Sequence, residues 1–161
     1  MQKTPKLVTF RPVGPDDEAF LLEVYAGTRL DELAVTPWDE SQREAFLRLQ
    51  FAAQQQHYQN HFPEADHQLI MVDERPVGRI YVAKRSDEVR ILDIALLPEE
   101  RNRGIGSFLI KEVMAEASKA GKPVRIYVES LNPSLKLFER LGFSGVQDIG
   151  THFLLEWRSP D

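Results

Sequence analysis

A turn that combines two glycines with two arginines lies in the second half of this 161-residue chain. It follows an apolar, strand-like run and directly precedes a segment with helical periodicity. Gly104 and Gly106 lack a Cβ, so the backbone can approach a ligand closely, and the first amides of a helix have no intrahelical partners. With the charges of Arg101 and Arg103, these amides favour an anion such as a pyrophosphate. A tight turn with solvated arginines explains the same residues without a ligand.

Two motifs in this region resemble those of a known superfamily. The spacing differs from that of the common nucleotide loops, because no Gly-Lys-Ser/Thr follows and Leu109 replaces the third glycine of a dinucleotide fingerprint. Residues 101–106 instead resemble the acyl-CoA pyrophosphate loop of the GNAT superfamily of N-acyltransferases, Arg/Gln-x-x-Gly-x-Gly/Ala. Residues 132–143 resemble the Asn-containing helix of that superfamily, which ends in Leu-Gly-Phe. The resemblance covers about residues 7–157 and is strongest from 91 to 143.

The composition is that of a folded chain, with 42% hydrophobic and 28% charged residues. We expect a single domain over residues 1–161 and no membrane span, because no apolar run is long enough. The sequence has no signal-peptide pattern, so we expect a cytoplasmic protein, and the absence of cysteine excludes disulfides and a cysteine nucleophile. A net charge of -5 argues against a nucleic-acid partner. The sequence does not set the oligomeric state, and a homodimer is one option.

Propensity and turn residues predict the order strand, two helices, three strands, helix, strand, helix, two strands. Pro15 begins the first helix, and Ser41 with Glu44 forms a capping box for the second. Gly121 ends a helix that connects two strands by a parallel crossover. The expected strands are 7–11, 68–73, 77–83, 89–97, 124–128 and a final hairpin with Val146 and 153–157, and the expected helices are 15–28, 41–60, one through 108–117, and 132–141.

The resemblance implies an α/β fold, α+β by some schemes, with a mixed, mostly antiparallel central sheet flanked by helices. In that fold two central parallel strands splay apart, and the pantetheine of acetyl-CoA lies in the gap like an added strand. Here those strands would be 92–97 and 124–130. The resemblance also implies acetyl-CoA as co-substrate, held by the first splayed strand, the glycine turn and the Asn-containing helix. The predicted contacts are Ile94, Ala95, Leu96, Arg101, Arg103, Gly104, Ile105, Gly106, Ser107, Asn132 and Phe138.

Asp93 is the one acid within the apolar strand beside the expected splay, and it is a candidate general base for the attacking amine. A structural carboxylate bonded to a neighbouring loop or to an arginine is the alternative. Many GNAT enzymes carry a tyrosine acid for the departing thiolate where this chain has Phe138, which has no proton to donate. The proton route is therefore expected through water, Ser134 or Tyr127. Asn132 is expected to bond the pantetheine amides or to cap its own helix.

Arg29, Glu32 and Trp38 lie between the first two helices, where the resemblance implies the acceptor pocket. Their mixture of charge and aromatic character suits a charged amine, although a solvated loop anchored by Trp38 explains them as well. His57 and His61 stand four residues apart on a predicted helix, as metal ligands can. A solvated helix end is the better explanation, and we expect no metal site.

The function implied by the resemblance is acetyl transfer from acetyl-CoA to a primary amine by direct attack in a ternary complex. Such a transfer needs a neutral amine, a polarised thioester and a proton route, but no covalent enzyme intermediate. The sequence does not identify the acceptor amine. The alternative is a non-catalytic acyl-CoA-binding module that uses the same cleft for sensing or assembly, and Phe138 is its main support.

Overall fold

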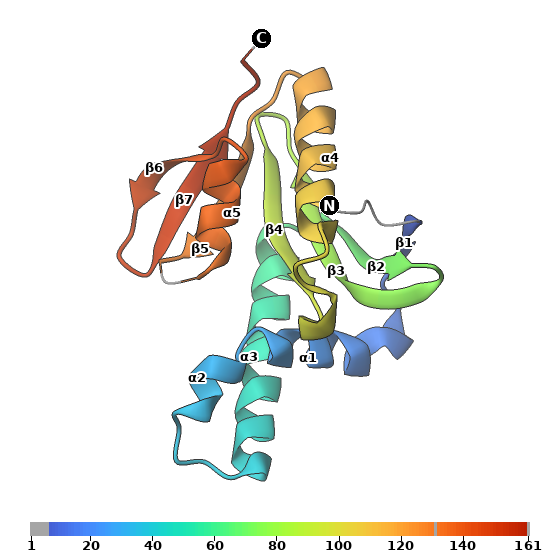
Figure 1. The fold of residues 1–161 in the computed structure, drawn as a ribbon, viewed down its shortest axis with the longest axis vertical. Helices are drawn as coiled ribbons and strands as arrows, with labels where there is room; N and C mark the ends of the chain where they lie inside the picture. The colour runs from blue at the N-terminus through green and yellow to red at the C-terminus, as the bar shows by residue number, and fades with distance from the viewer. Residues whose placement is uncertain (1–6, 131, 161) are drawn as a thin grey trace.

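The computed structural model describes residues 7–130 and 132–160, which form a seven-stranded sheet with helices on both faces (Figure 1). The strand order is β1-β2-β3-β4-β5-β7-β6. The elements in chain order are β1 (Val8–Pro12), the 3-10 turn η1 (Pro15–Asp17), α1 (Glu18–Gly27), α2 (Leu30–Ala34), α3 (Glu40–His61), β2 (Asp66–Val72), β3 (Arg75–Lys84), β4 (Val89–Leu96), the 3-10 turn η2 (Pro98–Glu100), α4 (Ile105–Lys119), β5 (Val124–Glu129), α5 (Ser134–Arg140), β6 (Ser144–Asp148) and β7 (His152–Trp157).

The sheet is antiparallel except for its central pair, β4 and β5, which α4 connects as a parallel crossover. In the described chain this pair is matched over three residues of each strand, 89–91 on β4 and 124–126 on β5. Beyond them the two strands diverge (Figure 1). The predicted fold class, a mostly antiparallel mixed sheet with a splayed parallel pair, is confirmed.

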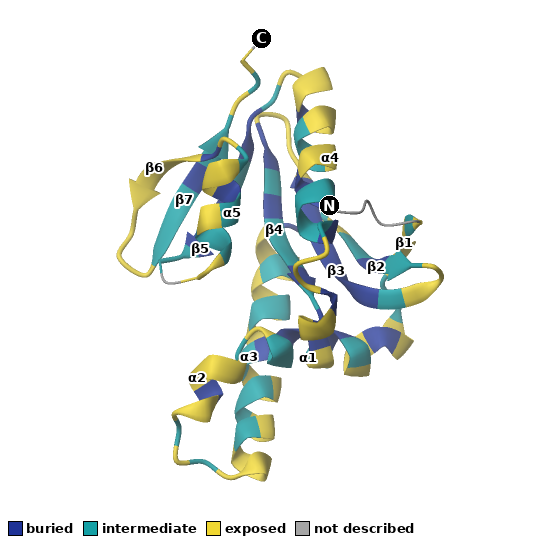
Figure 2. Cartoon of the chain, viewed as in Figure 1, coloured by how far each residue is buried: buried dark blue, intermediate teal, exposed yellow. Residues whose placement is uncertain are grey.

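The main hydrophobic core lies between the sheet and helices α4 and α5. Val124, Ile126 and Val128 alternate along β5 toward this core, and Ile110 and Phe138 enter it from the two helices. Each fully buried aliphatic side chain contributes about 1.5–3 kcal/mol to folding. A second apolar cluster packs α1 and α3 against β2 on the other face. The buried residues therefore follow the middle of the sheet and the inner sides of the helices (Figure 2).

Two features of the helices differ from the expected ones. The segment between the first two long helices contains the short helix α2, whose Leu33 is buried. Helix α3 begins at Glu40, and its capping box is formed by Asp39 and Gln42 instead of Ser41 and Glu44. The Ser41 prediction was wrong because Asp39 is an equally good cap two residues earlier, with a glutamine at the required spacing. None of the described helices is long and apolar enough to cross a membrane.

Candidate active site

The parallel pairing of β4 with β5 ends at Ile91, next to a bulge at Leu92 in the β3–β4 ladder. Residues 91 and 93 of β4 are opposite adjacent residues of β3, so Leu92 is an extra residue in the ladder. The Tyr58 hydroxyl of α3 donates a hydrogen bond to the Leu92 carbonyl oxygen at 2.9 Å and so holds the bulge from the α3 side. After the bulge, residues 94–96 continue to pair with β3 while β5 has moved away. The predicted contacts Ile94, Ala95 and Leu96 therefore lie on a strand with an open edge.

The glycine turn leads from η2 to the first residue of α4. Gly104 has φ 82°, a left-handed conformation that strains any residue with a Cβ, and Ile105 behind it is buried. A Cβ at Gly106 would lie 3.9 Å from Leu137 Cδ2, an ordinary contact. Packing within the chain therefore does not require glycine at position 106, and close approach of a ligand is a better reason for it. The first amides of α4, including that of Ser107, are those left free by helix geometry.

The two arginines of the turn have different surroundings. The Arg101 side chain donates to the Gly27 carbonyl oxygen at 3.1 Å and so connects the turn to the end of α1. The Arg103 side chain is 62% exposed and lies 3.7 Å from the buried Glu100, whose stronger partner is Arg75. Arg103 is therefore the freer cation for an anionic ligand at the start of α4.

Asp93 is held by an arginine from the neighbouring strand. Its Oδ2 accepts a hydrogen bond from Arg79 Nε at 2.8 Å, and its side chain is 29% exposed, compared with 1% for Arg79. This is the arginine contact that a structural role predicts. The hydrogen bonds of the described residues involve only Oδ2, so Oδ1 can receive a water or an amine. The base role of Asp93 stays a prediction.

Arg79 is the centre of a buried polar network that sequence reasoning missed. Its guanidinium also donates to the side-chain oxygens of Gln54 at 2.6 Å and Gln55 at 2.7 Å, and it lies over the Phe51 ring. Burying a charge is costly unless it is paired and hydrogen-bonded, as it is here. The available signal was a charged residue inside the apolar strand β3.

Two ring side chains beside this network have shifted pKa values. Burial lowers the pKa of His67 to about 4, and the Arg79 charge adds to the shift. The neutral imidazole stacks on the Tyr81 ring at 4.1 Å between centroids. Burial, followed by the negative charge of Asp93, raises the pKa of Tyr58. Tyr58 therefore stays protonated and keeps its bond to the bulge at neutral pH.

The predicted proton-route and pantetheine residues lie on β5 and around α5. Tyr127 is exposed on β5, and Ser134 is partly exposed at the start of α5. Asn132 Oδ1 accepts from the Ser134 backbone N–H at 2.9 Å, a local turn contact just before α5, whose N-cap is Pro133. Phe138 is 3% exposed and packs edge-on against Phe143 in the main core. This burial argues against the predicted contact between Phe138 and the cofactor.

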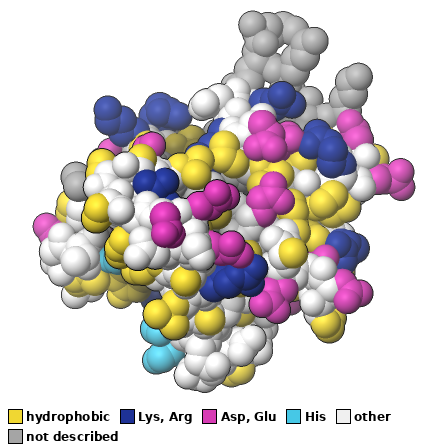
Figure 3. All heavy atoms as spheres, turned by 90° about the horizontal axis from the view of Figure 1, so that it is seen from below, with side chains coloured by type: hydrophobic (Ala, Val, Ile, Leu, Met, Phe, Trp, Pro, Cys, Tyr) yellow, Lys and Arg dark blue, Asp and Glu magenta, His cyan; other side chains and the backbone are white. Residues whose placement is uncertain are grey.

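The predicted acceptor residues separate into two groups. Arg29 bonds to Glu32 at 2.8 Å and, across the splay, to Glu129 at the end of β5 at 3.0 Å. It thereby ties the α1–α2 junction to β5. Trp38 instead packs on Phe46 of α3 at 4.9 Å between ring centroids, as a packing anchor would. Acidic and basic side chains are interspersed on the underside of the molecule (Figure 3).

The two histidines spaced four residues apart in the sequence lie on α3. His57 and His61 pack ring against ring on α3, and His61 Nδ1 lies 2.9 Å from the His57 carbonyl oxygen. Among the described residues no group of three or more histidine or acidic side chains is arranged to hold a metal ion.

Sequence comparison places this arrangement in a family. The model of the Acetyltransferase (GNAT) family matches residues 28–143, a range that contains the bulge, the glycine turn and the end of α5. The chain belongs to the GNAT acetyltransferase family. A comparison with curated proteins found no match.

Solved structures share the GNAT fold at low identity. PaiA N-acetyltransferase from Thermoplasma acidophilum, solved in complex with coenzyme A, has a TM-score of 0.71 and 19% identity over 95% of this chain and 99% of that chain. An acetyltransferase from Thermus thermophilus has a TM-score of 0.69 and 18% identity over 96% and 99%. The ribosomal-protein-S18-alanine N-acetyltransferase from Escherichia coli has a TM-score of 0.60 and 16% identity over 93% and 91%. At these identities the likeness establishes the fold alone.

Proposed function

We propose that this protein transfers the acetyl group of acetyl-CoA to a primary amine by direct attack within a ternary complex. The observation that carries the proposal is the continuity between the open edge of β4 and the glycine turn. Among the residues that the structure describes, β4 has no β5 partner beyond residue 91, and its chain leads through η2 to Gly104 and the first amides of α4. A linear ligand with a pyrophosphate at one end fits this path.

The acetyl-CoA site proposed here has two parts. The amides of residues 104–107, with Arg103 and then Arg101, hold the pyrophosphate. The backbone of residues 94–96 bonds the pantetheine as an added strand, and Asn132 contributes from the far side of the gap. Bound acetyl-CoA supplies an activated thioester carbonyl. PaiA in complex with coenzyme A supports this use of the fold.

The protein groups around the splay have distinct proposed tasks. Asp93 accepts the proton of the amine directly or through one water, using the carboxylate oxygen that Arg79 leaves free. Water, Ser134 or Tyr127 provides the proton for the leaving thiolate. Arg29, fixed by Glu129 and Glu32, borders the acceptor side.

The direct test measures thiol release from acetyl-CoA with a panel of amines, against controls without enzyme and without amine. Thiol release that requires both the enzyme and an amine, together with a product heavier by one acetyl group in mass spectrometry, is the expected result. Saturable acetyl-CoA binding without turnover for any amine would instead favour the non-catalytic module, which Phe138 at the usual tyrosine position makes the second candidate. Absence of acetyl-CoA binding would remove both.

A further inference from the structure

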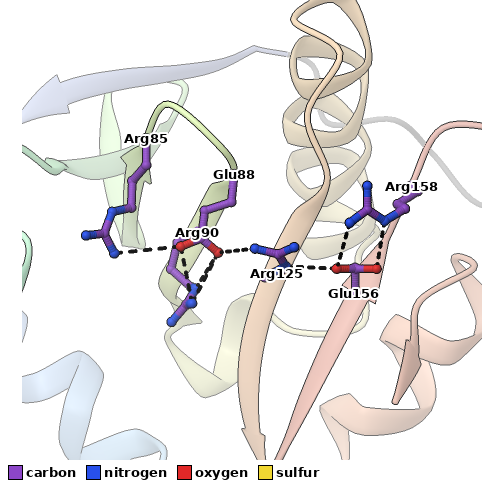
Figure 4. Close-up of polar contacts among 6 residues, drawn as sticks. All are labelled: Arg85, Glu88, Arg90, Arg125, Glu156 and Arg158. Carbon is purple, nitrogen blue, oxygen red and sulfur yellow. Dashed lines mark hydrogen bonds and ion pairs between the residues drawn. The ribbon is translucent and has the colours of Figure 1, made fainter. Parts of the chain in front are cut away.

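A ladder of four arginines and two glutamates crosses the sheet on the face opposite α4 (Figure 4). It runs from the β3–β4 turn over β4 and β5 to β7 and the segment after it. Glu88 pairs with Arg90 at 3.1 Å and Arg125 at 3.3 Å, with Arg85 at 3.7 Å. Glu156 continues the ladder with Arg125 at 2.8 Å and with the arginine after β7 at 2.9 Å. We refer to Arg85, Arg90, Arg125 and Arg158 as the arginine patch.

The charges of this ladder are layered. The glutamate side chains lie beneath, 5% exposed for Glu88 and 17% for Glu156. The outer arginines are 40% exposed at Arg85 and 63% at Arg158. Four cations against two carboxylates leave an excess of positive charge at the surface of a chain whose net charge is -5. A network that served only to neutralise itself would not need this excess.

Two guanidinium groups of the patch, those of Arg85 and Arg90, are held against aromatic rings. The Arg90 guanidinium lies over the Tyr127 ring at 5.1 Å and near the Phe62 ring at 5.9 Å, and Arg85 lies over the same Phe62 ring at 5.0 Å. Stacked guanidinium groups lose little freedom when they bind a carboxylate or phosphate. The stacked guanidinium groups of the patch are therefore preorganised to bind an anion.

The strand register brings the patch next to the splay. Arg90 and Arg125 are opposite each other on β4 and β5, one residue before the last matched pair. Tyr127, two residues after Arg125 on the same face of β5, is already beyond that pair. Two residues of strand span roughly 7 Å. Tyr127, the first residue on this face beyond the matched pairs, consequently lies about this far along β5 from Arg125.

We propose that the acceptor of this enzyme is an amine that carries an anionic group, a carboxylate or a phosphate, and that the arginine patch binds this group while the amine reaches the splay. The inference rests on the proposed acetyltransferase function and names its substrate class. It predicts a preference for acceptors whose amine and anion are separated by a flexible span of roughly 7 Å.

The experiment compares ω-amino carboxylates and ω-amino alkyl phosphates of increasing chain length with unsubstituted alkylamines of the same length. The selectivity ratio is kcat/KM for the anionic acceptor divided by kcat/KM for the alkylamine. We expect a ratio of about ten or more at the best length, because a charge-assisted contact of this kind changes affinity about tenfold. The series with the larger ratio identifies whether carboxylate or phosphate is preferred.

Variants connect the selectivity to the patch. Arg125→Gln and, separately, the more exposed Arg158→Gln should lower the ratio, Arg125→Gln by about tenfold. Arg48→Gln is the matched control, because Arg48 forms an exposed ion pair with Glu44 on α3, away from the patch. Equal use of alkylamines and anionic amines, or an equal ratio in all three variants, would overturn the inference while leaving acetyl transfer intact. Absence of transfer to every amine would overturn the proposed function itself.

Discussion

Two neighbouring parts of the proposed site use different chemical groups. One is the glycine turn at residues 101–107, and the other is the polar network around Arg79. In the proposed site the turn binds the pyrophosphate through backbone amides, and its arginines extend from the surface. The network is made of side chains from α3, β3 and β4, centred on a guanidinium that is 1% exposed. A change in the turn should therefore affect ligand affinity, whereas a change in the network should affect stability and the rate of the chemical step.

The largest effect is expected from Arg79→Met. The substitution leaves the partly buried acceptor oxygens of Asp93, Gln54 and Gln55 without their donor. We expect the free energy of unfolding to fall by about 3–5 kcal/mol, as for other broken buried pairs. Urea denaturation measures it, and the exposed Arg48→Met should change it by no more than about 0.5 kcal/mol. Equal costs for the two variants would contradict the account of the network.

Gly104→Val should separate affinity from stability in the turn. A valine there is strained at φ 82° and disturbs the backbone whose amides are proposed to bind the pyrophosphate, so we expect acetyl-CoA affinity to fall roughly tenfold to a hundredfold. Gly121→Val at the other end of α4 is a matched control, because Gly121 has φ 70° and open space around it. Calorimetric titration should give a weakened Kd for the first variant and an unchanged Kd for the second. Similar losses in both would assign the effect to backbone strain.

A smaller effect is expected from the titration of His67. Its folded pKa of about 4 lies below its unfolded value of about 6.5, so the unfolded state binds more protons between these values. Stability should therefore fall as pH is lowered from 6.5 toward 4, by about 1 kcal/mol because His67 is only partly buried. His67→Phe, which retains a ring beside Tyr81, should lose this dependence in thermal melts, and the exposed His57→Gln should keep it. A retained slope between pH 6.5 and 5 in His67→Phe would exclude His67 as its source.

The contrast between the glycine turn and the Arg79 network also explains which features could be predicted from the sequence. The residues of the glycine turn are contiguous in the sequence, and a glycine by itself indicates a backbone conformation or a close approach that other residues do not allow. Gly104 and the start of α4 could therefore be predicted. The order of helices and strands along the chain and the parallel crossover followed from apolar runs and turn residues. The Arg79 network joins residues that are far apart in the chain, and no local pattern connects Gln54 with Asp93. The cap at Asp39 was missed because two capping boxes overlap and only packing selects between them.

Phe138 illustrates the limit of a motif for assigning a site. Its position in the Leu-Gly-Phe helix associated it with the cofactor, but the helix presents this ring to the main core. The motif defines where the helix lies, while the direction of each side chain depends on the packing of α5 against β5. The arginine patch was missed for a related reason, since its members come from two strands, the β3–β4 turn and the segment after β7.

The account assigns ligand affinity to the glycine turn and the rate of the chemical step to the Arg79 network. The catalytic rate of Asp93→Asn tests this assignment most directly. Asparagine keeps an oxygen that can accept from Arg79, so most of the protein should remain folded. We expect kcat per folded molecule to fall about a hundredfold, with acetyl-CoA affinity unchanged and the ascending limb of the pH–rate profile shifted or lost. A wild-type rate and pH profile in the folded variant, with only a lower melting temperature, would contradict the account and assign Asp93 a structural role.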